Sequence, residues 1–337
     1  MINYFYIILN VVIFSLLYLL RDKICENLGL IIKPSKNSFH KKKSYLYGGL
    51  LLFPSFLIVF YSENFVLNQI QYLNYYLIIS FFVLALLDDM IDLSPLSKIL
   101  FSILILAIII NFDESLRIFY LKSIFFGELL FTNNYLIIYF FPILAIILLI
   151  NAFNFIDGIN GLATLVGLSF LAYIVLKNPI LIYSLYLILI AAIFFLFLNF
   201  RYSIFLGDSG NYLLSILIAS ILLKNNYYNP GSYYAEEIFL LLLIPGIDMF
   251  RLFIVRIYHG QNPLKGDINH LHHKLFYKFG LNKALIIYLS LVNIPIYLYY
   301  FLEKYYFFIL FFTLLFYIYL IQSKFLYRYK EKALKKK

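Results

Sequence analysis

Long apolar runs separated by short polar segments make up most of the 337-residue chain. A helix needs about 20 mainly apolar residues to cross the hydrocarbon core of a bilayer, and most of these runs reach or approach that length. The pattern predicts an all-α, polytopic integral membrane protein with about eleven transmembrane helices. The predicted spans are 3–20, 45–61, 70–87, 97–112, 133–151, 160–176, 179–198, 207–223, 236–256, 283–301 and 305–322.

One further apolar stretch, 118–131, does not fit this pattern. It contains Lys122 and Glu128, and charged side chains are costly in the hydrocarbon region. We therefore expect a re-entrant or surface segment there and not a twelfth span.

Composition supports the membrane assignment. The chain is 64% hydrophobic and 13% charged, with a mean hydropathy of +0.89, and a soluble domain of this length cannot bury so much apolar surface. The single cysteine, Cys25, excludes a disulfide or a Cys-based zinc site within one chain. The net charge of +10 could indicate nucleic-acid binding. The basic residues flank apolar runs, however, so we expect the lipid bilayer and no nucleic acid as partner.

The distribution of basic residues predicts the orientation. If the spans alternate in direction, all but five of the 27 lysines and arginines fall on one side, which the positive-inside rule makes cytoplasmic. The N-terminus is then outside and the C-terminus cytoplasmic. Residues 1–322 form a single transmembrane domain, and 323–337 form a basic cytoplasmic tail. The predicted cytoplasmic loops are 21–44, 88–96, 152–159, 199–206 and 257–282.

Most of the aspartates and all five histidines fall on that same predicted side. The positive-inside rule concerns only Lys and Arg, so this is an independent sorting. Ionisable groups at a membrane boundary are costly unless they are paired, hydrated or functional. Their gathering on one face predicts one cytoplasm-facing site.

Carboxylates close the third predicted span in the sequence Asp88-Asp89-Met90-Ile91-Asp92. Asp88 and Asp92 lie on one face of a helix, and Asp89 lies about 100° further round. Adjacent carboxylates repel unless a cation neutralises them, and Mg²⁺ typically takes one or two carboxylates together with waters and substrate phosphates. The alternative is a hydrated helix end with Lys98 as its counter-ion.

A short segment rich in amides and glycines lies between two later spans. Asn151, Asn154 and Asp157 recur every three residues, so on a helix they form one polar edge at the end of a span. Gly158 and Gly161 permit close approach of a neighbouring helix or a ligand. This combination predicts a ligand site, although an amide-rich loop that breaks the helix is the simpler alternative.

The sequence Gly207-Asp208-Ser209-Gly210 opens the eighth span. Free N–H groups and the helix dipole favour anions at such a position. Asp208 is either the N-cap of this helix or a further Mg²⁺ ligand facing Asp88 and Asp89.

Histidines and an arginine are candidate phosphate contacts. His270, His272 and His273 lack the i, i+4 pairing and the Cys partners of a zinc helix, and with Arg251 nearby they suit phosphate oxygens. His40 precedes three lysines that could gather a lipid phosphate. A basic loop bound to lipid head groups is the alternative.

Together these motifs resemble the polyprenyl-phosphate N-acetylhexosamine-1-phosphate transferases (glycosyltransferase family 4), integral membrane enzymes that start bacterial envelope glycans. The resemblance covers residues 34–275, and the His-x-His-His form is similar to the branch that uses UDP-N-acetylglucosamine. The chain departs from the family at Asn160, where Asp is frequent, and at Asn211, where Ser is usual. The motifs that carry the resemblance are Asp88–Asp92, Asn151–Ala163, Gly207–Gly210 and His270–His273.

The resemblance implies transfer of a sugar-1-phosphate, such as N-acetylglucosamine-1-phosphate, from a UDP-sugar to undecaprenyl phosphate, with release of UMP. It implies a Mg²⁺ cofactor, with Mn²⁺ as a substitute. It also implies a location in the bacterial cytoplasmic membrane with the active site facing the cytoplasm. The implied partners are UDP-N-acetylhexosamine, undecaprenyl phosphate and the bilayer, and family members often pair, which allows a homodimer.

The resemblance also implies roles for individual residues. Asp88, Asp89, Asp157 and Asp208 are catalytic candidates, with Asp208 and Asp89 as metal ligands and Asp88 as the base for the lipid phosphate. Candidate substrate-binding residues are Asn151, Asn154, His270, His272, His273, Arg251 and His40.

Two alternatives stay open. The phospho-N-acetylmuramoyl-pentapeptide transferase branch carries a different histidine cluster. A transporter or flippase for an anionic lipid-linked substrate is a different class of protein. Transporter sites lie near the bilayer midplane on broken helices, whereas the polar residues of this chain gather at the ends of spans.

Overall fold

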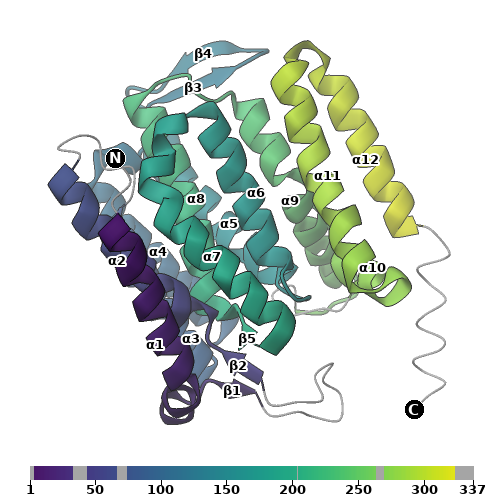
Figure 1. The fold of residues 1–337 in the computed structure, drawn as a ribbon. Coiled ribbons are helices and arrows are strands. Elements are labelled where there is room, and N and C mark those ends of the chain that lie inside the picture. The colour runs from purple at the N-terminus through teal and green to yellow at the C-terminus, as the bar shows by residue number, and fades with distance from the viewer. Residues whose placement is uncertain (1–3, 33–43, 67–73, 203, 263–268, 323–337) are drawn as a thin grey trace.

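The computed structural model describes residues 4–32, 44–66, 74–202, 204–262 and 269–322. Long helices run side by side as a bundle, and short strands lie at its two ends (Figure 1). The helices are α1 (Tyr4–Leu28), α2 (Gly48–Val66), α3 (Tyr75–Ile91), α4 (Pro95–Phe112), α5 (Phe141–Ile156), α6 (Leu162–Lys177), α7 (Ile182–Tyr202), α8 (Gly207–Tyr228), α9 (Ala235–Tyr258), α10 (Leu271–Phe279), α11 (Leu281–Phe301) and α12 (Tyr306–Gln322).

A helix occupies each of the predicted spans, and the protein is a mostly helical, multi-pass membrane protein. Seven helical segments are long and apolar enough to cross a bilayer. The helical parts Gly48–Val59 and Leu162–Lys177 are shorter but also apolar. Eleven crossings and the orientation of the termini stay predictions. The seven segments are Tyr4–Leu28, Pro95–Phe112, Leu136–Ile156, Pro179–Tyr202, Ala235–Tyr258, Leu281–Phe301 and Glu303–Gln322.

Helix α8 lies at the centre of the bundle, where it packs against α2, α3, α5 and α6. Most of its residues are buried, although the helix contains several serines and asparagines. The hydroxyl of Ser215 donates to the Asn211 carbonyl at 2.8 Å, and that of Ser220 donates to the Leu217 carbonyl at 3.1 Å. A buried hydroxyl is tolerated when it is hydrogen-bonded in this way.

A small sheet joins the first turns of α2 and α8 at one end of the bundle. Strand β2 (Ser44–Leu46) pairs antiparallel with β1 (Ile31–Ile32) and parallel with β5 (Ile204–Phe205). Immediately after β2, a Cβ on Gly49 would lie 2.2 Å from the Ser209 hydroxyl. Only glycine permits this approach of the two helix starts.

The opposite end of the bundle carries a feature that the sequence reading missed. Residues 118–131, predicted as a re-entrant or surface segment, contain an antiparallel hairpin of β3 (Tyr120–Ser123) and β4 (Gly127–Leu130). Its strands are short and partly exposed, so no alternation of buried and exposed positions marks them. The fold is therefore mostly helical with short strands, and not strictly all-α.

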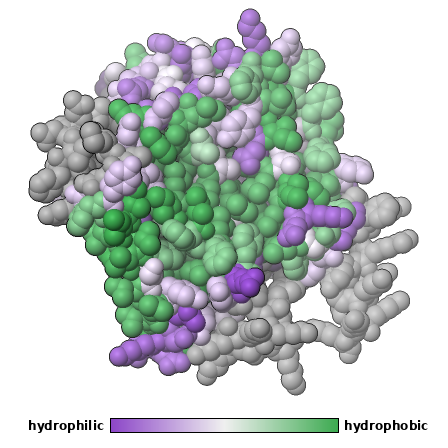
Figure 2. Space-filling view, in the orientation of Figure 1, coloured by the Kyte–Doolittle hydropathy of each residue, from purple (hydrophilic) through white to green (hydrophobic). Residues whose placement is uncertain are grey.

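Apolar side chains cover most of the middle of the molecular face in Figure 2, and hydrophilic ones gather mainly toward its upper and lower ends. Phenylalanines such as Phe308 and Phe312 of α12 are more than half exposed. This banding is expected for a protein whose middle faces lipid chains. The predicted basic tail, 323–337, lies outside the described residues.

Candidate active site

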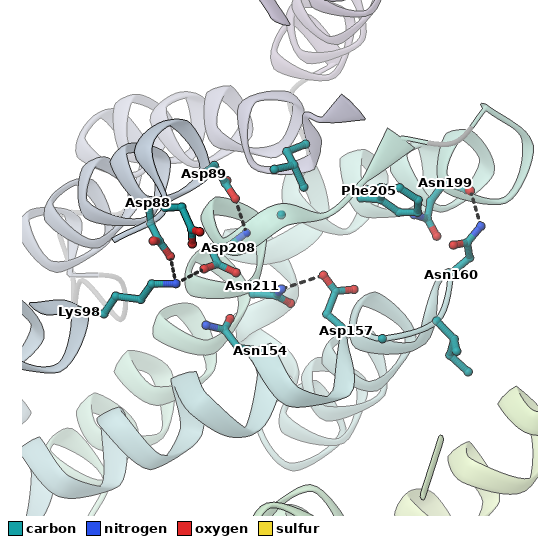
Figure 3. Close-up of a pocket in the computed structure, with 15 residues that line it drawn as sticks. Asp88, Asp89, Lys98, Asn154, Asp157, Asn160, Asn199, Phe205, Asp208 and Asn211 are labelled. Atoms are coloured by element: carbon teal, nitrogen blue, oxygen red, sulfur yellow. Dashed lines mark hydrogen bonds and ion pairs between the residues drawn. The ribbon is translucent and has the colours of Figure 1, made fainter. Parts of the chain in front are cut away.

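A cavity of about 420 Å³ opens where α3 and α5 end and α4 and α8 begin (Figure 3). It lies at the end of the bundle that carries the small sheet, since Leu46 of β2 and Phe205 of β5 line it. We call it the acidic cavity. Its lining residues are Leu46, Asp88, Asp89, Asp92, Lys98, Asn154, Asp157, Gly158, Ile159, Asn160, Asn199, Phe205, Gly207, Asp208 and Asn211.

The turn between α3 and α4 brings Lys98 back to the end of α3. Asp92 ends α3 with φ of 52°, a left-handed conformation that Asp adopts more readily than most residues. Ser94 then caps α4 by accepting the N–H of Ser97. As a result, the Lys98 ammonium forms an ion pair with Asp88.

The Lys98 ammonium lies between carboxylates from two helices. Besides its ion pair with Asp88, its Nζ is 3.1 Å from Oδ2 of Asp208 on α8 (Figure 3). The Asp88 side chain is 2% exposed and that of Asp208 is 30% exposed, so a ligand in the cavity can reach Asp208 directly. Carboxylates this close repel one another unless a cation lies between them. The geometry therefore favours a positive charge at this point.

Asp89 caps the first turn of α8 from the neighbouring helix α3. Its two oxygens accept the backbone N–H groups of Asp208 at 2.8 Å and of Ser209 at 3.0 Å. The turn needs Gly207, whose φ is +73° and whose added Cβ would meet an Asp89 oxygen at 2.9 Å. Because Asp89 supplies the cap, the Asp208 side chain is not used as the N-cap of its own helix. It turns toward the cavity instead.

The three polar residues predicted to form one edge of α5 do not all reach the cavity in the structure. Asn154 and Asp157 line the acidic cavity, whereas Asn151 donates to the carbonyl of Ile147 within its own helix at 2.8 Å and is not part of the lining. Asn154 Oδ1 is buried and has no hydrogen-bond partner. Such an atom is costly unless a ligand or water completes it.

Asp157 receives a hydrogen bond from Asn211 of α8, with Nδ2 and Oδ2 2.8 Å apart. Burial raises the pKa of Asp157 to about 8, the Asn211 bond opposes the shift, and the carboxylates of Asp208 and Asp89 add to it. A cation or a hydrogen-bond donor in the cavity would favour the ionised form.

Residues 269–273, which we call the histidine segment, are held by Asp248 of α9. Asp248 Oδ2 accepts from His270 Nδ1 at 2.9 Å and from the Leu271 N–H at 3.0 Å. Because a carboxylate accepts, His270 carries its proton on Nδ1. Its other ring nitrogen, Nε2, is buried without a hydrogen-bond partner.

The histidine segment packs against the wall of the acidic cavity. A Cβ on Gly158 would lie 2.2 Å from His272 Nε2 and 2.6 Å from the His273 ring, and the His270 ring stacks on Phe155 at 5.2 Å. Burial lowers the pKa of His272 well below its usual value, and the neighbouring histidines add to this. His272 is therefore a neutral imidazole, able to donate one hydrogen bond and accept another.

Arg251, predicted as a substrate ligand, contacts protein groups instead. It donates to Asp248 Oδ1 at 2.8 Å, to the Tyr317 hydroxyl at 2.9 Å and to the Asn269 carbonyl at 2.9 Å. It thus anchors the start of the histidine segment. The remaining predicted residue, His40, lies outside the described residues.

Sequence reasoning did not select Lys98, Asn211 or Asp248 as site residues. Lys98 was visible as a counter-ion to Asp88, but its contact with Asp208 spans 110 positions in the sequence. Asp248 precedes Arg251 by three residues, which is ion-pair spacing on a helix. That spacing was the one local signal of its role.

The donor set of the cavity suits Mg²⁺. Among the described residues, no three Asp, Glu, His or Cys side chains converge as a metal cluster. Mg²⁺ does not require one, because it binds through one or two carboxylates and takes its other ligands from water and phosphates. Asp208 and Asp88 already share a cation, the Lys98 ammonium. The unpartnered amide oxygen of Asn154 is a further oxygen donor at the same cavity.

The chain is similar in sequence to known proteins of one family. The family model described as "Glycosyl transferase family 4" matches residues 72–226. The chain is 30% identical over 282 residues to the probable undecaprenyl-phosphate N-acetylglucosaminyl 1-phosphate transferase of Bacillus subtilis, covering 79% of this chain and 76% of that protein. It is 26% and 25% identical to the undecaprenyl-phosphate α-N-acetylglucosaminyl 1-phosphate transferases of Salmonella typhi and Escherichia coli K12, covering 79% of this chain and 74% of each relative.

Proposed function

Because the chain belongs to glycosyl transferase family 4, we propose that it transfers N-acetylglucosamine-1-phosphate from UDP-N-acetylglucosamine to undecaprenyl phosphate. The products are undecaprenyl-diphospho-N-acetylglucosamine and UMP. The observation that carries the proposal is the meeting of Asp88, Asp208 and Lys98 at one cavity, at the end of a membrane-protein bundle. We place that end on the cytoplasmic side of the bacterial inner membrane, as the distribution of lysines and arginines predicts.

We assign the metal position to the point where Asp208 and Asp88 converge. Asp208 is the principal ligand in this proposal because it is the more exposed of the two carboxylates. Asp89, expected from the sequence to be a second ligand, uses both oxygens on the backbone of α8. We therefore assign it to fixing the position of Asp208. Bound Mg²⁺, or Mn²⁺ in its place, would neutralise the phosphate oxygens of the donor.

The reaction brings two anions together. An oxygen of the lipid phosphate attacks the β-phosphorus of the donor, and the bond from that phosphorus to the oxygen of the UMP leaving group breaks. Charge repulsion and alignment dominate the barrier of such transfers. Once Asp208 binds a metal ion in place of the Lys98 ammonium, the ammonium is free to contact the diphosphate of the donor. Asp88 would act through the Lys98 ammonium that it holds, which can attract the attacking phosphate. That phosphate is mostly dianionic at neutral pH and needs little deprotonation.

The other polar groups of the cavity would position the donor. Asn154 and Asp157 offer hydrogen bonds to the nucleotide or its diphosphate from the end of α5. His272 and His273 contact Gly158 in the wall of the cavity and would reach the diphosphate or the sugar from there. His270 does not line the cavity. It is held by Asp248 with its Nε2 unpartnered, and in this proposal it fixes the histidine segment beside the donor.

An in vitro transfer assay tests the proposal. Purified protein in detergent, undecaprenyl phosphate and Mg²⁺ are given UDP-N-acetylglucosamine or another UDP-N-acetylhexosamine, and UMP and the butanol-soluble lipid product are measured. We expect both products to appear together, to require the divalent cation and to stop with EDTA. Folded protein that releases no UMP with any of these donors would refute the proposal and favour the transport alternative.

A further inference from the structure

Helix α12 sends one polar side chain into the network that holds the histidine segment. Tyr317 is 3% exposed, whereas Tyr319 on the same helix is 66% exposed. A phenolic hydroxyl is costly to bury unless it finds a partner, and that of Tyr317 has two. It donates to Asp248 Oδ1 at 2.8 Å and accepts from Arg251 Nε at 2.9 Å.

The directions of these hydrogen bonds are fixed by chemistry. Arginine has no acceptor, so its Nε must donate to the tyrosine oxygen. The tyrosine proton is then left for the carboxylate of Asp248. Tyr317 therefore holds the charged ends of Asp248 and Arg251 in one arrangement relative to each other.

Asp248 and Arg251 each continue from Tyr317 to the histidine segment. Asp248 presents Oδ1 to Tyr317 and Arg251, and Oδ2 to His270 Nδ1 and the Leu271 N–H. Arg251 Nη2 donates to the Asn269 carbonyl at 2.9 Å. Two paths thus lead from one hydroxyl on α12 to neighbouring residues of the histidine segment.

We propose that Tyr317 is a positioning residue for donor binding, which acts by orienting Asp248 and Arg251 so that they hold the histidine segment, through its His270, against Gly158 of the acidic cavity. The inference rests on the proposed function and adds to it a residue of α12 that is not part of the cavity lining and lies outside residues 72–226. Tyr317 itself does not touch substrate. Its effect passes through the buried carboxylate of Asp248, which is 1% exposed.

The test is Tyr317→Phe, which keeps the ring and removes only the hydroxyl. We expect the KM for UDP-N-acetylglucosamine to rise about five- to tenfold, the size of effect typical of one hydrogen bond. The KM for undecaprenyl phosphate should stay within twofold of wild type. The matched control is Tyr319→Phe, which removes an exposed hydroxyl from the same helix and should leave both KM values unchanged.

A second arm separates positioning from a general structural role. In a His270→Ala background, Tyr317→Phe should change the donor KM by less than about twofold, because the group through which it acts is gone. Full additivity of the two substitutions would overturn the proposal, as would a Tyr317→Phe protein with wild-type donor KM. A lower yield of folded protein with both KM values unchanged would also overturn it.

The same experiment distinguishes failure of this inference from failure of the proposed function. Binding of UDP-N-acetylglucosamine to the wild-type protein is measured by calorimetry beside the turnover assay. Wild-type protein that neither binds nor turns over this donor overturns the proposed function, and the inference with it. An active wild-type preparation with an unaffected Tyr317→Phe variant overturns the inference alone.

Discussion

Charged side chains gather at both ends of the helix bundle, but their hydrogen bonds are completed to different extents. At the end that carries the β3–β4 hairpin, Glu237 accepts from the Tyr173 hydroxyl at 2.5 Å, from Lys177 at 3.3 Å and from the Tyr234 N–H at 3.2 Å. Glu236 accepts from the Ser123 hydroxyl and the Ile124 N–H. These carboxylates tie the hairpin and α6 to the start of α9.

At the end that carries the acidic cavity, several buried polar atoms have no hydrogen-bond partner. They include Asn154 Oδ1, Asn211 Oδ1, His270 Nε2 and both ring nitrogens of His272. Asn154 and Asn211 line the cavity of about 420 Å³, and His272 contacts Gly158 in its wall. The hairpin end has such an atom too, the Tyr299 hydroxyl, but the buried carboxylates described there are hydrogen-bonded. Incomplete hydrogen bonding is costly in a folded protein, and several such atoms around one cavity indicate a place where a ligand completes them.

The comparison shows that residue type alone does not identify a site in this protein. Asp113, near the hairpin end, is also a partly buried carboxylate with charged and polar partners, Lys224 at 3.2 Å and Asn74 at 2.7 Å. It is satisfied by protein groups, and we assign it to stability. Asp208 pairs with Lys98, which also pairs with Asp88, and it lines the acidic cavity. We assign it to catalysis.

The largest expected effect is that of Asp208→Asn. Removing the charge of the principal proposed metal ligand should lower turnover at least about 100-fold, while the fold is kept because Asp89 still caps α8. UMP release and the thermal unfolding profile are measured on the same preparation. Asp113→Asn is the control at the other end, with turnover per folded molecule near wild type. Wild-type turnover in Asp208→Asn would remove the metal assignment.

Lys98→Met should have the next largest effect. The ammonium contacts Asp88 and Asp208, so it competes with a metal ion for them and also supplies a positive charge for the diphosphate. Its loss should lower turnover about 10- to 100-fold and reduce the Mg²⁺ concentration that gives half-maximal activity. Lys304→Met, an exposed lysine near the hairpin, should change neither quantity. An unchanged Mg²⁺ requirement in Lys98→Met would contradict the shared cation position.

Much of the fold could be predicted because the length of an apolar run determines where a membrane helix forms. Helix α10 escaped prediction because its nine residues are too few and too polar to be a span. The hairpin escaped it because Lys122 and Glu128 interrupt an apolar run without giving an alternation of buried and exposed positions. These elements depend on contacts with other parts of the chain.

For the site, the sequence indicated which carboxylates take part but not the role of each one. Asp88 and Asp89 are neighbours in one motif, yet one faces Lys98 and the other caps a helix that begins 118 positions later. Only the packing of α3 against α8 determines that Asp88 pairs with Lys98 and that Asp89 caps α8. Arg251 was predicted to bind substrate because basic residues suit phosphates. In the structure its guanidinium forms an ion pair with the buried Asp248, three residues earlier.

A smaller effect is expected for Gly158→Ala, which tests the contact between the cavity wall and the histidine segment. The new Cβ would press on His272 and His273, so we expect the donor KM to rise about tenfold, as for a misplaced binding group. Gly246→Ala is the matched control, because an added Cβ there meets nothing within 4 Å. An unchanged donor KM in Gly158→Ala would show that the segment does not contribute to donor binding.

The smallest effect on activity is expected at the hairpin end, for Glu237→Gln. The amide cannot serve Lys177 as a counter-ion, and its NH₂ group must face donors that the carboxylate accepted. We expect a loss of about 1–3 kcal/mol in the free energy of unfolding, measured by thermal unfolding in detergent, with kcat and both KM values within twofold of wild type. Unchanged stability would mean that a carboxylate with complete hydrogen bonding contributes little here. A large fall in kcat at wild-type stability would mean that this end takes part in catalysis, and the contrast between the two ends would then be lost.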